Sequence, residues 1–163
     1  MDQRAANDVL VALRRITRAI DLHSRGLIAR HGLTVPQLLV LQVLAGRGAL
    51  PTGELSSAVN LSNATVTSIV GRLVSRGLVS RRRSEQDRRV VLVALSEAGQ
   101  EAVAQAPGLL QERFVRAFGE LAPWEQSLIL SSLQRVAAMM DADELDAAPM
   151  LVPGASVEPG PEG

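Results

Sequence analysis

Apolar side chains recur three or four residues apart along most of the chain, which predicts a mainly helical protein. The first such run covers residues 4–30 and ends at His31-Gly32, because glycine readily adopts the left-handed conformation that closes a helix. A second, largely buried helix is expected after Thr34, which suits the N-cap position, and Pro36 is tolerated in its first turn. The N-terminal part is therefore predicted to hold one long helix followed by a shorter one.

Two further short helices are expected next, separated by a tight turn. One begins at Thr52, and the other is capped by Ser62 and ends at Gly77. Asn60-Leu61 forms the turn between them, with Leu61 as its buried residue. Helix, short turn and helix in this order predict a helix-turn-helix motif.

The period of the apolar positions then changes from that of helices to that of strands. Residues 78–83 and 90–95 are β-prone runs, and the polar loop 84–89 separates them. This pattern predicts a β-hairpin with a long, charged tip. A hairpin directly after a helix-turn-helix is a wing.

The C-terminal part returns to helical spacing. Ser96 is expected to cap a helix that Pro107-Gly108 kinks or breaks, because proline lacks the amide donor and clashes with the preceding turn. Apolar positions continue after the break, and Pro123 opens the last predicted helix. Acids, Pro and Gly dominate from about residue 141, so residues 147–163 are expected to be disordered.

The composition excludes several kinds of chemistry. The chain has no cysteine, which excludes disulfides, thiolate metal sites and cysteine nucleophiles. Its only histidines are His23 and His31, and no Gly-rich phosphate loop or metal-ligand spacing appears, so we expect no cofactor, no metal and no enzymatic activity. Neither a run of 18 apolar residues nor a signal peptide is present, so a cytoplasmic protein without membrane contact is expected.

The charges balance overall but are segregated along the chain. All 17 basic residues are Arg, and they match 17 acidic residues. Residues 1–46 carry six Arg against three acids, residues 47–95 eight against three, and residues 96–163 three against eleven. The middle of the chain is therefore basic, which favours a polyanion-binding face there, although a solvated arginine surface is the alternative.

The fourth predicted helix has an unusual outward face. At 100° per residue, Val66, Val70 and Leu73 define the inward side, and the opposite side is small and uncharged, with arginine further along. Short side chains let a helix enter the major groove of DNA, and Asn, Ser, Thr and Arg bind base edges or phosphates there. An ordinary amphipathic surface helix is the alternative, but residues 62–83 contain no acid. The candidate DNA-binding residues of this helix are Ser62, Asn63, Thr65, Thr67, Ser68, Arg72 and Arg76.

The predicted wing concentrates positive charge. The alternative to a DNA-binding role is a charged hairpin that is simply solvated. Asp87 lies two residues before Arg89, close enough to hold that guanidinium by a bidentate contact. An arginine fixed at a hairpin tip is suited to a narrow minor groove, where negative potential is concentrated. The candidate DNA-binding residues of the wing are Arg81, Arg82, Arg83, Asp87, Arg88 and Arg89.

Three segments resemble the multiple antibiotic resistance regulator (MarR) family of winged-helix transcriptional regulators. They are residues 32–38 (GLTVPQL), residues 61–67 (LSNATVT) continuing into 72–79 (RLVSRGLV), and residues 87–99 (DRRVVLVALSEAG). Length and helix order fit over nearly the whole chain. The resemblance implies a homodimer of intertwined terminal helices that binds palindromic double-stranded DNA and is released, in many members, by a small aromatic or anionic effector. Pro107-Gly108 departs from the family by interrupting a helix usually written as continuous.

The expected fold is thus mainly α, an α+β winged helix: a helix-turn-helix with a β-hairpin wing plus N- and C-terminal dimerisation helices. Homodimerisation also follows from the residues, because the terminal helices are too apolar to be exposed in a monomer. The effector pocket is expected between the first helix, the second helix and the start of the fifth. The predicted parts are a dimerisation region at 1–34 and 96–142, a winged helix-turn-helix DNA-binding domain at 35–95, and an acidic, disordered tail at 143–163.

The function predicted from the sequence is a DNA-binding transcriptional regulator, most simply a repressor. Two alternatives belong to other classes. A winged helix could dock an acidic protein partner through its wing arginines, and such a complex would resist competition by duplex DNA. An enzyme that uses the winged helix only for dimerisation has no catalytic constellation or spare domain to support it.

Overall fold

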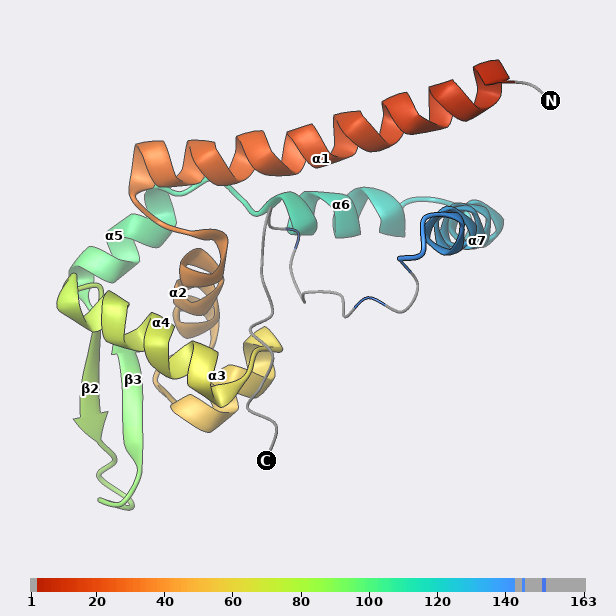
Figure 1. Cartoon of the computed structure of the whole chain (residues 1–163). Coiled ribbons are helices and arrows are strands. Elements are labelled where there is room, and N and C mark those ends of the chain that lie inside the picture. Colours follow the sequence, from red (N-terminus) through yellow and green to blue (C-terminus); the bar gives the residue numbers. More distant parts are fainter. Residues whose placement is uncertain (1–2, 143–144, 146–150, 152–163) are drawn as a thin grey trace. The chain divides into compact units, whose positions relative to one another are not determined.

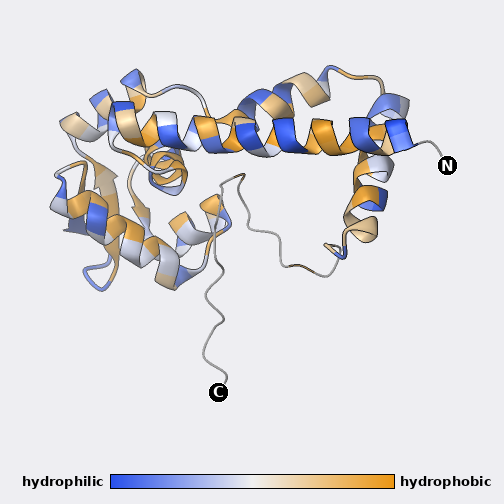
Figure 2. Cartoon of the chain, turned by 45° about the horizontal axis from the view of Figure 1, so that its top comes forward, coloured by the Kyte–Doolittle hydropathy of each residue, from blue (hydrophilic) through white to orange (hydrophobic). Residues whose placement is uncertain are grey.

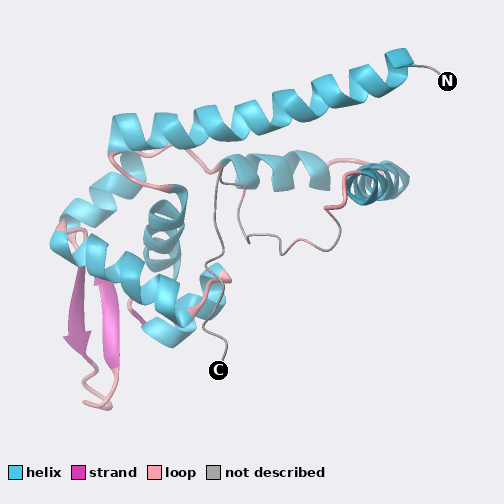
Figure 3. Ribbon diagram, in the orientation of Figure 1, coloured by secondary structure: helices cyan, strands magenta, loops and turns pink. Residues whose placement is uncertain are grey.

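The computed structural model describes residues 3–142, 145 and 151 of the chain (Figure 1). The expected acidic, disordered tail at 143–163 lies outside the described residues, apart from Leu145 and Leu151. The chain divides into two compact units, Met1–Pro107 and Gly108–Gly163. Figure 3 shows that helices dominate and that the long strands belong to one hairpin, which is the mainly α winged-helix class predicted from the sequence.

The first unit begins with the two predicted helices, α1 (Gln3–His31) and α2 (Val35–Arg47). Gly32 has φ +62°, the left-handed conformation expected at the end of α1. Thr34 caps α2 through a reciprocal pair: its hydroxyl accepts from the backbone N–H of Gln37 at 3.4 Å, and the Gln37 side chain accepts from the Thr34 N–H at 3.0 Å. No single described helix is both long and apolar enough to span a membrane. Among the described residues, only α1 and α2 taken together reach the length and apolar composition of a span, and they are bent by 69°.

The helix-turn-helix is formed by α3 (Thr52–Val59) and α4 (Asn63–Ser75), as predicted. Asn60 makes the turn with φ 54°, a left-handed conformation that asparagine tolerates better than most residues. The Ser62 hydroxyl caps α4 by accepting from the Thr65 N–H at 3.1 Å. Local side-chain chemistry therefore defines both the turn and the start of the second helix.

The predicted wing is a hairpin of β2 (Val79–Arg83) and β3 (Val91–Leu95), paired antiparallel. A third strand that the periodicity did not predict, β1 (Leu50–Pro51), pairs with the other edge of β3 and gives the order β1-β3-β2. Two residues carry no detectable period, so the position of β1 depends on tertiary pairing rather than on local sequence.

The core of the first unit lies where α2, α3 and α4 meet the end of α1 and the inner face of the sheet. Leu and Val fill it, which is how a chain with 2% aromatic residues packs an interior. The fully buried side chains are Leu27, Leu33, Leu38, Val40, Leu41, Leu55, Val66, Val70, Leu73 and Val93.

The start of α5 (Glu97–Gln105) docks on the turn between α4 and β2. The Ser96 hydroxyl accepts from the Gly99 N–H at 3.0 Å and donates to the Gly77 carbonyl at 2.6 Å, and the Ser96 N–H donates to the Leu78 carbonyl at 3.1 Å. A Cβ on Gly99 would overlap the Leu78 carbonyl oxygen. Glycine is therefore required for this close approach of helix and turn.

The second unit contains α6 (Leu110–Gly119) and α7 (Pro123–Met139). The predicted break is confirmed, because α5 ends at Gln105 and a separate helix starts three residues after Pro107. Carboxylates close the first turn of each helix: Glu112 accepts from the Leu109 N–H at 3.1 Å, and Glu125 accepts from the Ala122 N–H at 2.9 Å.

Candidate nucleic-acid interface

The outward face of α4 is the one predicted from its periodicity. Val66, Val70 and Leu73 are fully buried, so the opposite side of the helix faces solvent. The exposed positions on that side carry small or hydroxyl side chains and one arginine; they are Ala64, Thr65, Thr67, Ser68, Gly71, Arg72 and Ser75. No acidic residue occurs on α4. A helix with this face can approach a polyanion closely without electrostatic repulsion.

Hydrogen bonds at the start of α4 divide its polar residues into engaged and available groups. The Ser62 and Thr65 hydroxyls pair with each other at 2.8 Å, and the Ser56 hydroxyl donates to the Asn63 side-chain oxygen at 2.7 Å. The Asn63 amide nitrogen is left as a donor. Within the described part of the chain, no side-chain hydrogen bond engages Thr67 or Ser68, and both residues are exposed, so their hydroxyls are available to a ligand.

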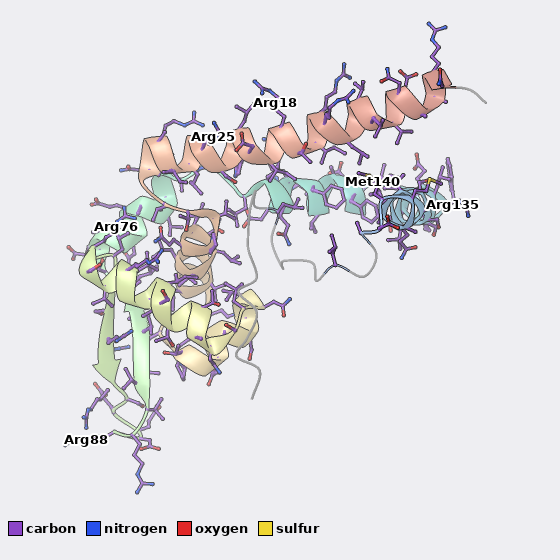
Figure 4. The ribbon with its side chains drawn as sticks, viewed as in Figure 1. Arg18, Arg25, Arg76, Arg88, Arg135 and Met140 are labelled. Carbon is purple, nitrogen blue, oxygen red and sulfur yellow. The ribbon has the colours of Figure 1, made fainter. Side chains whose placement is uncertain are left out.

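The two arginines near the end of α4 differ in their surroundings. The Arg72 side chain is exposed and has no acidic partner among residues 3–142, 145 and 151. Arg76, labelled in Figure 4, instead donates from Nη1 to the Gly32 carbonyl at 2.6 Å, across a sequence separation of 44 residues. Both arginines were predicted from the sequence to bind DNA. In the structure, only the Arg76 side chain is hydrogen-bonded to another part of the protein.

The three consecutive wing arginines do not share one face of the sheet. In the antiparallel register, Arg81 pairs with the buried Val93 and Arg83 pairs with Val91, whereas Arg82 pairs with Leu92. Directly opposed residues point to the same face and neighbours along a strand alternate. Arg81 and Arg83 therefore lie on the face that also carries the core, and Arg82 lies on the outer face.

Backbone hydrogen bonds organise the tip of the wing. The Asp87 carboxylate accepts from the backbone N–H of Arg89 at 2.9 Å, and the Ser84 hydroxyl accepts from the N–H groups of Gln86 and Asp87 at 3.3 and 3.4 Å. The expected contact between Asp87 and the Arg89 guanidinium is not seen: the one ion pair among the described residues joins Arg25 to Asp21 at 2.9 Å. Asp87 thus shapes the loop, and Figure 4 shows Arg88 extended at its tip.

A cavity of about 400 Å³ in the first unit lies between the end of α2, the wing strands and α5. Small and aliphatic side chains from the end of α2, β3 and α5 line it, together with Arg82 and Gln100. The effector pocket was expected between the first, second and fifth helices. This cavity is lined by residues of α2, β2, β3 and α5, and by no residue of α1. Arg82 is the single charged group on its wall.

Sequence reasoning missed two groups that hold side chains of the predicted site. Ser56 holds Asn63 across the turn, and the Gly32 carbonyl holds Arg76. A backbone carbonyl leaves no side-chain signal in a sequence, so its pairing with Arg76 follows only from the tertiary structure. The described residues contain no group of three or more His, Asp or Glu side chains placed to hold a metal ion.

Fold and surface together define a winged-helix, DNA-binding class of transcriptional regulator. The family model described as MarR family matches residues 33–91, which cover the helix-turn-helix and the start of the second wing strand. This match and the relatives below support a transcriptional regulator of the MarR type. That family and its relatives are transcriptional regulators rather than enzymes.

Curated relatives and solved structures are similar to this chain over most of its length. A helix-turn-helix-type transcriptional regulator of Mycobacterium bovis is 28% identical over 140 residues, which is 86% of this chain and 95% of the relative. A probable transcriptional regulator from Pseudomonas aeruginosa is 28% identical with a TM-score of 0.56, covering 82% and 99% of the two chains. Bordetella bronchiseptica BpsR, whose DNA binding is regulated by 6-hydroxynicotinic acid, is 28% identical with a TM-score of 0.52, covering 80% and 98%.

Proposed function

We propose that this protein is a repressor that binds palindromic operator DNA as a homodimer and is released by a small anionic effector. The observation that carries the proposal is the exposed face of α4, which is small, hydroxyl-bearing and free of acids, beside an arginine-bearing wing. Surface helices ordinarily expose acids and long charged side chains, so this face is suited to close contact with a polyanion.

On DNA, α4 enters the major groove with its N-terminal half against the bases. Thr67 and Ser68 bond base edges, the Asn63 amide nitrogen donates to an acceptor, and Arg72 binds phosphate or guanine. Ser62 and Thr65, whose hydroxyls are paired with each other, fix the position of the helix start. A helix N-terminus also attracts phosphate through its unpaired N–H groups.

The wing contacts the neighbouring minor groove and backbone. Arg88 and Arg89 lie at the exposed tip, and Arg81 and Arg83 follow along one face of β2. Narrow minor grooves concentrate negative potential and attract arginine. Asp87 supports this contact by ordering the loop through the Arg89 N–H rather than by pairing with its guanidinium.

Dimerisation is proposed from the exposed apolar surface of α1. One line of that helix includes Leu27, which the winged-helix core buries completely, and continues to Ile16 and Val9, which are 51% and 45% exposed. Figure 2 shows apolar positions recurring along α1. Large apolar side chains on α6 and α7, such as Phe114 and Leu128, are also exposed. Surfaces of this kind mark interfaces, so we propose residues 1–34 and 96–142 as the dimerisation region.

A two-fold axis would set the spacing of the DNA contacts. Two copies of α4 would enter successive major grooves about 34 Å apart, which matches half-sites about 10 base pairs apart, centre to centre. The operator is therefore expected to be a palindrome. This spacing also gives an effector a way to act, because a ligand that binds one separation of the lobes better than the other shifts the dimer away from DNA.

The cavity beside Arg82 supports the proposal that a small effector binds this protein. It is large enough for a small aromatic acid, small side chains leave its wall open, and one guanidinium is available for a carboxylate. BpsR, which is similar to this chain, is regulated by an acid of that kind. This cavity connects the end of α2 and α5 to β2, so a ligand there would change how the wing sits against α5.

Selection of bound duplexes from a random DNA pool tests the proposal. The expected result is a palindrome with half-sites about 10 base pairs apart, bound at one dimer per duplex. In transcription with purified polymerase, a promoter overlapping the selected site should give less transcript as the protein is added. A pool with no enriched sequence would contradict the proposal, and a complex with an acidic protein that duplex DNA cannot displace would favour the docking alternative.

A further inference from the structure

Arg76 makes a contact that the predicted DNA-binding role does not explain. It is the C-cap residue of α4, and its Nη1 donates to the Gly32 carbonyl at 2.6 Å. Gly32 directly follows α1 and is separated from Arg76 by 44 residues. The recognition helix and the long N-terminal helix of the same protomer are therefore joined directly at their C-terminal ends.

The chemistry of the two groups suits a lasting contact. The last carbonyls of a helix lack intrahelical donors and sit at the negative end of the helix dipole, which a guanidinium complements. The Gly32 N–H already donates to the Ile28 carbonyl at 2.8 Å, so Arg76 satisfies the other polar group of the same residue. The planar guanidinium also lies against the glycine, because a Cβ there would be 3.1 Å from Nη2.

This contact differs from the one at the other end of α4. The Ser56–Asn63 hydrogen bond, at 2.7 Å, joins α4 to α3 within the helix-turn-helix. The Arg76–Gly32 hydrogen bond leaves the helix-turn-helix and reaches α1. Only the second contact bears on the angle between the recognition helix and the proposed dimerisation helix.

We propose that Arg76 is a positioning residue that fixes α4 to the end of α1 and thereby sets the half-site spacing that the dimer accepts. The proposal rests on the operator-binding homodimer proposed above. Because α1 also joins the two protomers in that dimer, the angle between α1 and α4 determines the distance between the two recognition helices. Arg76 then acts on DNA selectivity without contacting phosphate, unlike Arg72 one turn earlier on the same helix.

The experiment compares R76M with R72M, a matched control on the same exposed helix. Methionine keeps an unbranched side chain and removes the charge and every donor. Affinity is measured for the selected operator and for duplexes with one base pair added or removed at its centre, which changes the half-site distance by about 3.4 Å. The salt dependence is measured on the selected operator.

R76M is expected to lose about five-fold or more of the discrimination between the selected and altered spacings, the factor expected for one exposed charge-assisted hydrogen bond. Its log–log salt slope should match the wild type. R72M should lower the slope by about 1.8, since each phosphate contact contributes about 0.9 and the dimer carries two copies. A lowered slope with unchanged spacing discrimination in R76M would overturn the proposal, and so would no change in either quantity.

A second measurement reads the contact without DNA. Hydrogen–deuterium exchange at the Gly32 amide, which donates to Ile28, should be faster in R76M than in the wild type and unchanged in R72M. Equal exchange in all three proteins would show that Arg76 does not hold the end of α1. If the wild type bound no duplex, the proposed function would fail while the exchange data still decided the role of Arg76.

Discussion

Replacing Gly99 by alanine tests how closely α5 is docked on the winged helix. A Cβ at this position would overlap the Leu78 carbonyl oxygen and lie 2.9 Å from Leu95 Cδ2. The carbonyl oxygen belongs to the backbone of the turn into β2, so it cannot rotate away as a flexible side chain would. Relief requires α5 to move, which would strain the bonds from Ser96 to Gly77 and Leu78.

The expected change in the free energy of unfolding of G99A is the sum of opposing effects. Alanine favours a helix over glycine by about 0.5–1 kcal/mol, which would stabilise G99A. Overpacking against a fixed backbone costs about 1–3 kcal/mol, and weakening the two Ser96 bonds costs about 1 kcal/mol each. The expected net loss is about 3 kcal/mol, which corresponds to a fall in Tm of about 6–12 °C for a chain of this size.

The assay is thermal and urea unfolding followed by circular dichroism, at one protomer concentration, because dimer stability depends on concentration. The matched control is G71A, on the exposed face of α4, where a Cβ would meet no atom within 4 Å. G71A should be more stable than the wild type by about 0.5–1 kcal/mol. A G99A protein as stable as the wild type would refute the close docking of α5 on the turn.

Three further substitutions test the proposed interfaces. R89A should weaken operator binding by about 2 kcal/mol without changing the Tm, in a titration against the selected duplex, and unchanged affinity would remove the wing tip from the interface. R81A should lower the log–log salt slope by about 1.8 while R82A, on the opposite face of β2, leaves it unchanged; equal slopes would contradict the division of the wing faces. I16D should convert the dimer to a monomer in sedimentation, whereas R18A should not, and a dimeric I16D protein would exclude α1 from the interface.

Helix boundaries were predictable because each depends on a few adjacent residues. Thr34, Ser62 and Ser96 cap the helices expected of them, and their bonds reach only three residues ahead. The break at Pro107 has the same local origin. In contrast, β1 exists only because Leu50 meets Val93, a pairing that no short window of sequence contains.

The candidate site was predictable where it depends on periodicity and not where it depends on tertiary contacts. The buried side of α4 followed from the 100° spacing of Val66 and Val70. The alternation that separates Arg82 from its neighbours was available in the same way, since the strand period is two. The pairing of Arg76 with Gly32 was not, because it joins distant parts of the chain through a backbone oxygen.

The most direct test of the central claim is a site-specific disulfide between α4 and the major groove. The chain has no cysteine, so S68C introduces a unique thiol on the exposed face of the helix. A selected operator with a thiol tethered to a base in the major groove of one half-site should crosslink to S68C. It should not crosslink to R18C, at an exposed position of α1 (Figure 4). Absence of a crosslink from S68C, or equal yields from the two variants, would contradict the placement of α4 in the groove.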